Sequence, residues 1–274
     1  MRSAIRNIIL STQRPILDRL SVRAVAIYSL RRMRADYAGF CVRVRRSSDS
    51  TERNIGFVGN VIDTVALLAF VGAGDGFVVR KHDHSVNGFD ATQSNAAFQP
   101  RIVSAGVLDI RNARATTIYS GTQRLQTAAV INHPAQLSAC VVAFSDTNSA
   151  RAIFQLGAPN TLGSLFVETS NWLARSTSFT SASTPYINNS LEQLSVVIQN
   201  LSQAIYRRGV IGTNGSDGLA SASNAVLTIG GLSNSVYLLT GGISELVLFP
   251  SPLSTADRQL LERDQGTYYG ITVA

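Results

Sequence analysis

The sequence is poor in the residues on which much enzyme chemistry depends. Its 274 residues include three histidines, two cysteines, one tryptophan and a single lysine, Lys81. Cys41 and Cys140 are too few for a disulfide scaffold and lie in apolar runs, so we expect buried, reduced thiols. No stretch reaches the roughly 18 uninterrupted apolar residues that a membrane-spanning helix needs. We therefore expect neither a disulfide-stapled fold nor a helical membrane span.

Familiar catalytic patterns are also missing. There is no Gly-x-Ser-x-Gly sequence, which argues against a serine nucleophile of the hydrolase type. The stretch "GAGDG" at residues 72–76 lacks the Lys-Ser/Thr pair that follows in a phosphate-binding loop. We expect no cofactor and no metal.

The positive charge is concentrated in the first part of the chain. Residues 1–53 hold twelve arginines against four acids, a net charge of +8, whereas the whole chain carries +7. Guanidinium groups bind carboxylates and phosphates in a bidentate manner, so this part suits docking onto an acidic surface, or pairing with the chain's own acids. Without interleaved aromatic residues or a known motif, nucleic acid is the weaker of the possible partners.

The remaining pattern indicates an all-β protein. We expect a basic N-terminal arm at residues 1–20, and one domain at residues 21–274 that begins with a helix at residues 21–37. Alternation of apolar and basic residues predicts a strand at 40–49, and a short helix at 62–74 precedes another strand at 76–82. Beyond residue 100, short β-like runs separated by Gly, Asn, Ser and Pro predict an antiparallel sandwich. Ser254 is positioned to cap a C-terminal helix.

The segment "KHDHSVNGFD", residues 81–90, gathers two histidines and two aspartates. His82 and His84 would share one face of a strand, and a metal ion there would need a further ligand from elsewhere. Asp83 and Asp90 are better suited as acceptors for backbone amides in a turn. We therefore interpret the segment as a structural turn.

Two stretches resemble known proteins. Residues 227–271, with "GGISELVLFPSPLS" and "TYYG", are similar to the closing segment of concanavalin A-like (laminin G-like) jelly rolls. Residues 28–57 and 78–93 resemble the α-L-arabinofuranosidase B catalytic domain, and still more the related domains of tailed-phage virion proteins. The matching positions in the second stretch are Asp83, Ser85, Asn87, Gly88, Asp90, Ala91, Thr92 and Gln93, whereas Lys81, His82, His84 and Val86 depart from the family pattern. The resemblance implies a concanavalin A-like antiparallel β-sandwich (jelly roll) with an N-terminal helical arm and a short C-terminal helix.

The resemblance also bears on activity. In the arabinofuranosidases the nucleophile lies on a Gly-Met-Glu-Thr-like strand beside a vicinal cysteine pair, and the nearest match is Glu168 in "LFVETSNW", without those cysteines. We interpret Glu168 as a solvent-facing strand residue and expect no enzymatic activity. Jelly rolls can bind sugars through aromatic and amide side chains on loops, and the candidates are Trp172, Tyr186, Asn188 and Asn189. Trp172 could instead fill the core or an interface.

The sequence thus predicts a structural protein of a tailed-phage or phage-like particle, a head or tail fibre or spike, located in the virion and assembled in the host bacterial cytoplasm. Expected partners are other virion proteins of the capsid, neck or tail, further copies of the chain, and host cell-surface polysaccharide. The docking residues of the arm would be Arg2, Arg6, Ile8, Ile9, Leu10, Arg14 and Arg19. The alternative is a glycoside hydrolase of the arabinofuranosidase type, or a stand-alone carbohydrate-binding module.

Overall fold

Strand β15 (Leu137–Ser145) shows how the sequence builds two apolar layers. All nine residues are buried, and successive side chains point to opposite faces of the strand. Leu137, Ala139, Val141 and Ala143 face the main core, whereas Val142 and Phe144 face a second apolar layer. A strand of this kind must be covered on both sides.

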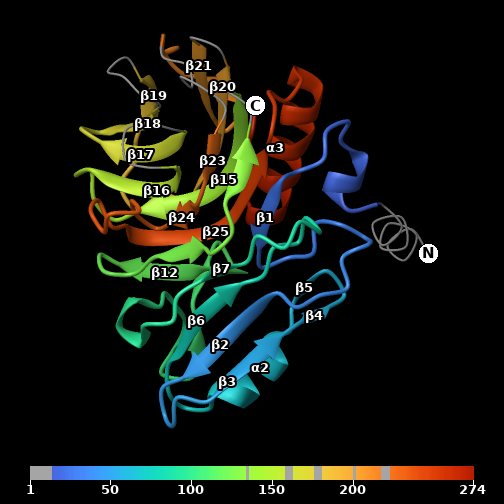
Figure 1. Ribbon diagram of the computed structural model, residues 1–274, viewed down its shortest axis with the longest axis vertical. Helices are drawn as coiled ribbons and strands as arrows, with labels where there is room; N and C mark the ends of the chain where they lie inside the picture. The colour runs from blue at the N-terminus through green and yellow to red at the C-terminus, as the bar shows by residue number, and fades with distance from the viewer. Residues whose placement is uncertain (1–13, 134–135, 158–162, 176–180, 200–201, 217–222) are drawn as a thin grey trace.

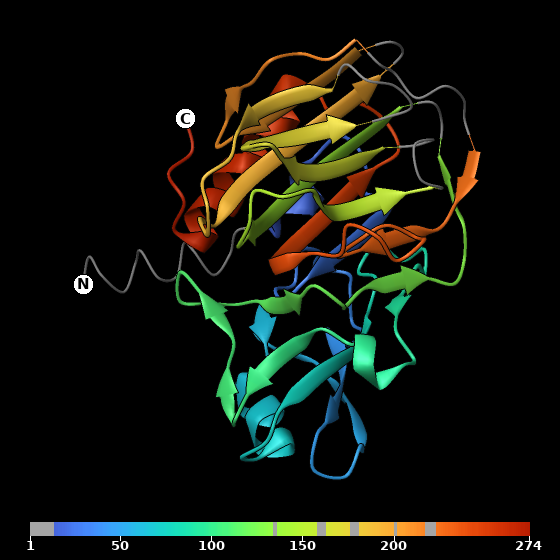
Figure 2. The same cartoon turned by 90° about the vertical axis from the view of Figure 1, so that its left-hand side faces the viewer.

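The computed structural model describes residues 14–133, 136–157, 163–175, 181–199, 202–216 and 223–274. It is a β-sandwich, as the sequence predicts, with two antiparallel layers that are plain in Figure 2. In the first layer, neighbouring strands are β21 (Ser202–Arg207), β20 (Glu192–Gln199), β15 and β25 (Thr240–Phe249). The other edge of β25 is shared end to end by β1 (Ala26–Ser29) and β12 (Thr117–Ser120).

The second layer packs against the first around the main core. Its neighbouring strands are β19 (Ala182–Pro185), β18 (Asn171–Arg175), β17 (Ser164–Glu168), β16 (Arg151–Leu156), β24 (Leu227–Ile229), β13 (Leu125–Thr127) and β7 (Ala91–Thr92). Trp172, Phe154 and Leu246 are among the fully buried side chains between the layers.

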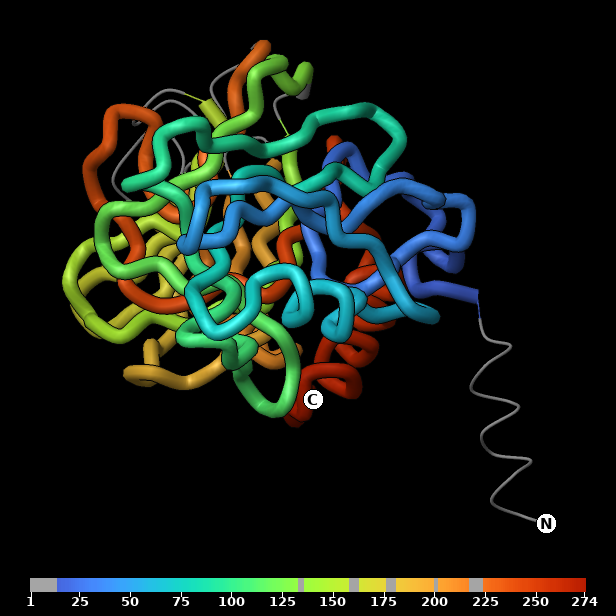
Figure 3. The backbone as a smooth tube through the Cα atoms, turned by 90° about the horizontal axis from the view of Figure 1, so that it is seen from below, coloured from blue at the N-terminus to red at the C-terminus, as the bar shows by residue number. Residues whose placement is uncertain are grey.

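A smaller lobe continues both layers at one end of the sandwich (Figure 1), and Figure 3 shows it in front when the molecule is seen from below. It contains β2 (Val42–Arg46), β3 (Glu52–Ile55), β6 (Gly76–Lys81), β8 (Arg101–Ser104) and α2 (Thr64–Val71). Strand β6 pairs with β7 of one layer and with β8, which in turn pairs with β12 of the other. The short elements are η1 (Ile16–Arg19), β4 (Phe57–Val58), β5 (Val61–Ile62), η2 (Ala96–Phe98), β9 (Val107–Leu108), β10 (Ile110–Arg111), β11 (Arg114–Ala115), β14 (Ile131–His133), β22 (Val210–Ile211) and β23 (Ser223–Ala225).

Both predicted short helices are present, and the cap expected at Ser254 is confirmed. Asp63 accepts a hydrogen bond from Ala66 N at the start of α2. Ser254 caps α3 (Thr255–Tyr269), and the left-handed Gly270 ends it. Helix α3 lies on the outer face of β15, β20 and β25, where Leu261 packs with Cys140 and Phe249. No helix in the described ranges is long and apolar enough to cross a membrane.

The predicted helix at residues 21–37 is wrong, because this segment contains strand β1. Its residues are buried on both faces: Ala26 and Tyr28 belong to the main core, whereas Ile27 packs under α3. A continuous apolar run does not distinguish a buried strand from a helix, and here the free edge of β25 decides in favour of a strand.

A buried polar network joins β1, β25 and α3. Arg31 contacts Glu245 at 2.8 Å and Asp264 at 2.7 Å, and Gln265 donates to Glu245. Burial alone would raise the pKa of the Glu245 carboxyl, but the Arg31 guanidinium outweighs it and the pKa lies below its ordinary value. Glu245 is the acid of the Gly-Ile-x-Glu stretch, so this part of the resemblance reflects a fold-stabilising ion pair.

Candidate functional site

A polar cavity of about 350 Å³ lies at one end of the sandwich, where three loops meet. Its lining residues are Asp146, Thr147, Asn148, Ser170, Tyr186 and Asn188. They come from the β15–β16 loop, the β17–β18 turn and the segment after β19. A volume of this size is within the range of small-molecule sites. We call it the Asp146 cavity.

Backbone hydrogen bonds hold the three loops together. Thr169 and Ser170 both have positive φ, 46° and 64°, which gives a tight two-residue hairpin turn. Tyr186 N donates to Ser170 O at 2.9 Å, and Asn189 N donates to Ser145 O at 2.9 Å. The lining side chains are therefore displayed by a fixed backbone, which favours specific binding.

Asp146 differs from every other described carboxylate. Its side chain is exposed and takes part in no ion pair or hydrogen bond, whereas each of the other aspartates and glutamates in the described ranges has at least one such partner. A carboxylate without a partner retains its full capacity to accept hydrogen bonds or to exchange a proton. Asp146 is therefore the acid in this cavity that is free to act on a ligand.

Tyr186 connects the cavity to the core. Its hydroxyl donates to Ser145 O at 2.6 Å and contacts Asn188 Oδ1 at 2.8 Å. Burial raises the pKa of this hydroxyl, and the nearby negative charge of Asp146 acts in the same direction. The Tyr186 ring meets Trp172 edge to face, with centroids 5.6 Å apart. The position of the ring is therefore fixed by packing.

The predicted glycan-binding residues separate into two groups. Tyr186 and Asn188 line the Asp146 cavity, and Asn189 lines a neighbouring cavity that also includes Asn188. Trp172 is completely buried in the main core, so it cannot stack on a sugar at the surface. In β18 its side chain points inward because Leu173 and Arg175 occupy the outer face.

Glu168 lies at the last position of β17, next to the turn that lines the cavity. Its side chain is half-buried and forms an ion pair with Arg175, on the face of the hairpin opposite Trp172. Register places Val167 opposite Arg151, so the loop before β16 and Glu168 lie at the same end of the layer. Glu168 is near the Asp146 cavity in the fold but does not line it.

The turn at residues 81–90 is structural, as the sequence predicts. Asp83 accepts hydrogen bonds from the backbone amides of Ile27, Ser85 and Phe89, at 2.9–3.0 Å. Asp90 accepts from Asp83 N at 2.8 Å. Both carboxylates are occupied by the chain itself and are not available for a ligand.

The two histidines of this turn have different surroundings. His82 contacts Asp90 at 3.1 Å, whereas His84 is fully buried, stacked on Tyr37 with centroids 4.5 Å apart. Neither ring nitrogen of His84 has a hydrogen-bond partner among the described residues. Burial lowers the pKa of His84 to about 3, so the ring is neutral in the folded protein.

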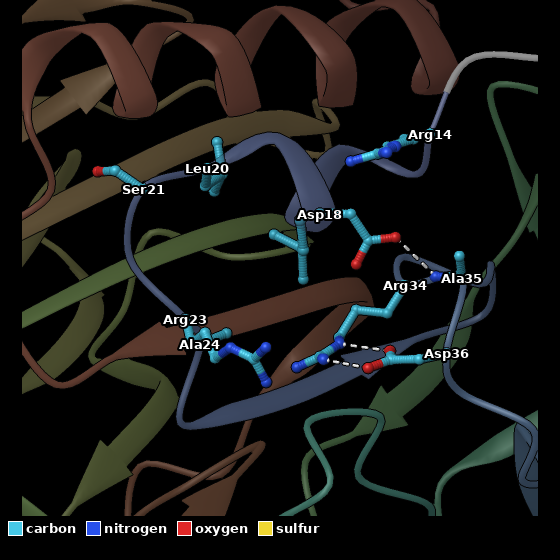
Figure 4. Close-up of a pocket in the computed structure, with 10 residues that line it drawn as sticks. Arg14, Asp18, Leu20, Ser21, Arg23, Ala24, Arg34, Ala35 and Asp36 are labelled. Carbon is cyan, nitrogen blue, oxygen red and sulfur yellow. Dashed lines mark hydrogen bonds and ion pairs between the residues drawn. The ribbon is translucent and has the colours of Figure 1, made fainter.

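A second cavity, of about 450 Å³, lies beside the described part of the predicted arm (Figure 4). Arg34 donates to both oxygens of Asp36, and Asp18 accepts from Ala35 N at 2.8 Å. Arg14 and Arg23 line the same cavity and form no ion pair or hydrogen bond within the described ranges. We call it the Arg14 cavity.

The predicted docking residues fall only partly within the described chain. Arg2, Arg6, Ile8, Ile9 and Leu10 lie outside the described residues. Arg14 lines the Arg14 cavity and Arg19 is exposed. Residues 16 and 17 of the predicted arm are buried against α3 and β25, so this part packs on its own domain.

The sequence interpretation missed Asp146, Thr147, Asn148 and Ser170. The signal was present in "SDTNS", residues 145–149, a polar group between two apolar runs that predicts a loop. The sequence therefore predicts a loop here. It does not predict that this loop lies beside the β17–β18 turn, because that depends on the order of the strands in the layer.

Comparison with known proteins places the fold. No family model and no curated protein matches the sequence. Among solved structures, an arabinofuranosidase complexed with arabinofuranosyl-α-1,2-xylobiose matches with a TM-score of 0.74 and 13% identity, over 91% of this chain and 63% of that one. A mutant GH54 α-L-arabinofuranosidase soaked with 4-nitrophenyl α-L-arabinofuranoside matches with a TM-score of 0.71, at the same identity and coverage. The chain thus spans 63% of the length of these proteins.

These likenesses correct two predictions. At 13% identity they show the fold, a β-sandwich related to that of the arabinofuranosidases. Three solved structures that match over 91% of the chain are arabinofuranosidases, which overturns the prediction of a structural virion protein without enzymatic activity. They favour the alternative stated from the sequence, a glycoside hydrolase of the arabinofuranosidase type.

Proposed function

We propose that the chain is a glycoside hydrolase whose sugar site is the Asp146 cavity. One observation carries the proposal: the single described carboxylate without a partner lies in a cavity beside Tyr186 and Asn188. Hydroxyl, amide and carboxylate groups around an aromatic edge are suited to the hydroxyl groups of a sugar. The fold shared with arabinofuranosidases supports the same reaction class.

The proposed chemistry uses two carboxyl groups. Asp146 donates a proton to the oxygen of the leaving group as the glycosidic bond breaks, and later accepts a proton from the attacking water. Glu168, the nearest match to the family's nucleophile strand, is the candidate nucleophile: it lies at the same end of the layer, and to reach a sugar it must exchange its ion pair with Arg175 for the cavity that it does not line in this structure. It attacks the anomeric carbon, and water then hydrolyses the glycosyl ester and restores both groups.

The test is hydrolysis of 4-nitrophenyl α-L-arabinofuranoside by the purified full chain, followed as release of nitrophenol. We expect Asp146→Asn to lower kcat by at least about 100-fold, since general acid catalysis contributes about 10²- to 10⁴-fold. Glu168→Gln should also lower kcat. The matched control is Asp49→Asn, an exposed acid in a hairpin turn of the lobe, which should leave kcat unchanged.

Binding separates the possible failures. Trp172 is the only tryptophan and touches Tyr186, so its fluorescence reports a ligand in the Asp146 cavity. Sugar binding that Asp146→Asn weakens, without hydrolysis by the wild type, would leave a carbohydrate-binding module and reject the enzyme. Absence of both hydrolysis and binding, over a panel of furanosides and pyranosides, would reject the site itself.

We also propose that the Arg14 cavity docks an acidic segment of a partner protein. The supporting observation is that Arg14 and Arg23 both reach this cavity without an ion pair or hydrogen bond of their own in the described part of the chain. Exposed guanidinium groups recognise carboxylates by charge and geometry. Binding of a polyglutamate peptide should weaken with salt and fall several-fold in the double variant Arg14→Gln/Arg23→Gln. Equal binding by wild type and variant would reject this proposal.

A further inference from the structure

The Asp146 cavity does not end at Asn188. On the other side of this residue lies a second cavity of about 490 Å³, which shares Asn188 with the first. Asn189, with a positive φ of 57°, and the segment after α3 form part of its wall. The two cavities therefore meet at Asn188, a polar residue that lines both.

The charges of the two cavities differ in sign. The first carries Asp146, whereas the second is lined by Arg111 and Arg208 and by no aspartate or glutamate side chain among the described residues. Arg208 is held by the fully buried Glu192 at 2.6 Å, and Arg207 shares this carboxylate at 3.4 Å. One negative charge thus faces two guanidinium groups, which leaves the surface positive.

Arg111 is the residue best placed to use this charge. Its guanidinium lies over the Phe144 ring, 4.0 Å from the centroid, and donates to Asn189 O at 3.1 Å. It has no carboxylate partner in the described ranges. Stacking on Phe144 and the bond to Asn189 fix the side chain in advance, so less conformational entropy is lost when it binds an anion.

We propose that the substrate is an acidic glycan, with one sugar residue in the Asp146 cavity and a neighbouring residue that carries an oxyanion substituent beside Arg111. This inference rests on the proposed function, because it extends the same site. The substituent is a carboxylate, as in a uronic acid, or a sulfate ester, since a guanidinium pairs with both. Asn188 contacts both residues of the glycan.

The experiment compares matched oligosaccharides. An arabinofuranosyl xylo-oligosaccharide is titrated with and without a glucuronic acid branch, and with a sulfate ester in place of that branch, while Trp172 fluorescence and calorimetry are recorded. We expect the acidic forms to bind about 10-fold more tightly than the neutral form at low salt, with the difference reduced at high salt. The stronger of the two acidic ligands identifies the source of the charge.

Variants of Arg111 assign the effect. Arg111→Gln should remove the 10-fold preference, so that the acidic and neutral oligosaccharides bind with equal affinity. Arg111→Lys, which keeps the charge, should retain part of the preference and guards against a fold defect. Equal affinity of the wild type for neutral and acidic ligands, or an equal loss for both in Arg111→Gln, would overturn the inference while leaving the proposed function intact. Absence of binding by all three ligands, together with absence of hydrolysis and binding over the sugar panel, would reject the proposed function and this extension together.

Discussion

Two acid-bearing loops of this molecule use the same residue type in opposite ways. In the 81–90 turn, Asp83 and Asp90 accept backbone amide hydrogen bonds and are occupied by the chain. In the 146–148 loop, the Asp146 side chain has no such partner in the part of the chain that the structure describes. An aspartate indicates a ligand site only when its carboxylate oxygens do not already accept hydrogen bonds from the chain itself. The 81–90 turn, which gathers two histidines and two aspartates, is thus structural. The 146–148 loop, which has a single acid, carries the candidate site.

The largest difference between the two loops should appear in stability. Asp83→Ala leaves three backbone amides without an acceptor, one of them in β1, in a buried setting. We expect a loss of about 3–5 kcal/mol in the free energy of unfolding, measured by urea titration at pH 7. Asp49→Ala, which removes an exposed pair with Arg46, is the control and should cost less than about 1 kcal/mol. A small loss in Asp83→Ala would remove the contrast.

The second-largest effect should be a loss of stability at low pH, through His84 of the 81–90 turn. The pKa of His84 is about 3 in the fold, through burial, with His82, Lys81 and Arg32 adding to the effect and Asp90 opposing it. The unfolded chain binds this proton near its ordinary pKa of 6.5, so stability falls as the pH decreases from 6.5 towards 3.

His84→Phe tests this dependence. At pH 4, the lowered pKa of His84 should reduce the free energy of unfolding of the wild type by about 3 kcal/mol, since each pKa unit corresponds to about 1.4 kcal/mol. In His84→Phe this part of the decrease in the free energy of unfolding with decreasing pH should be absent. Urea titrations at pH 7, 5.5 and 4 measure it. Parallel slopes in the two proteins would place the acid sensitivity elsewhere.

Lys81 should give a smaller effect of the same sign, at higher pH. It is buried, and within the described ranges its ammonium group has one hydrogen bond, a long one of 3.5 Å to Ile243 O. Burial lowers the pKa of Lys81 to about 8, and Cys41 opposes the shift. The folded protein therefore holds a charge at a cost at pH 7, and stability rises as the pH increases from 8 to 10.5.

Lys81→Met should remove that cost. We expect a gain of about 2 kcal/mol in the free energy of unfolding at pH 7, and no rise between pH 8 and 10.5. The measurement is urea unfolding at three pH values. A destabilised variant would mean that the ammonium group has a stronger interaction than its distances indicate.

The smallest expected effect completes the comparison. Asp146→Asn should change the free energy of unfolding by less than about 0.5 kcal/mol, because the side chain is exposed and unpaired. The same variant should lose hydrolysis. A loss of stability as large as that of Asp83→Ala would show that Asp146 is structural too.

The sequence predicts local features well where they depend on neighbours along the chain. The cap at Ser254, the strands of the second half and the turn acceptors Asp83 and Asp90 all follow from residue chemistry at short range. Strand β1 fails because its identity depends on a partner at the other end of the chain. The inward orientation of Trp172 likewise depends on which face of β18 meets the core.

The sequence predicts some residues of the candidate site and not others. Tyr186, Asn188 and Asn189 have the composition of a polar binding loop, and they line the two cavities. Asp146 and Arg111 come from segments distant in sequence, the β15–β16 loop and strand β10, and only the packing of the fold brings them to the same end. Asp146 and Arg111 are candidates because neither has an oppositely charged partner in the described ranges. The absence of a contact cannot be read from a sequence pattern.

The pairing of β1 with β25 has a consequence for synthesis in the cell. Strand β1 is among the first described elements to leave the ribosome, yet its partner, in the register Ala26↔Leu248, is among the last. Until then, Ile27 and Tyr28 have no sheet to cover them, and the apolar first strand is exposed to wrong partners. Closure of this long loop must wait until β25 has been translated, so the sandwich should fold slowly. Its yield should depend on how well the early strand is protected while it waits.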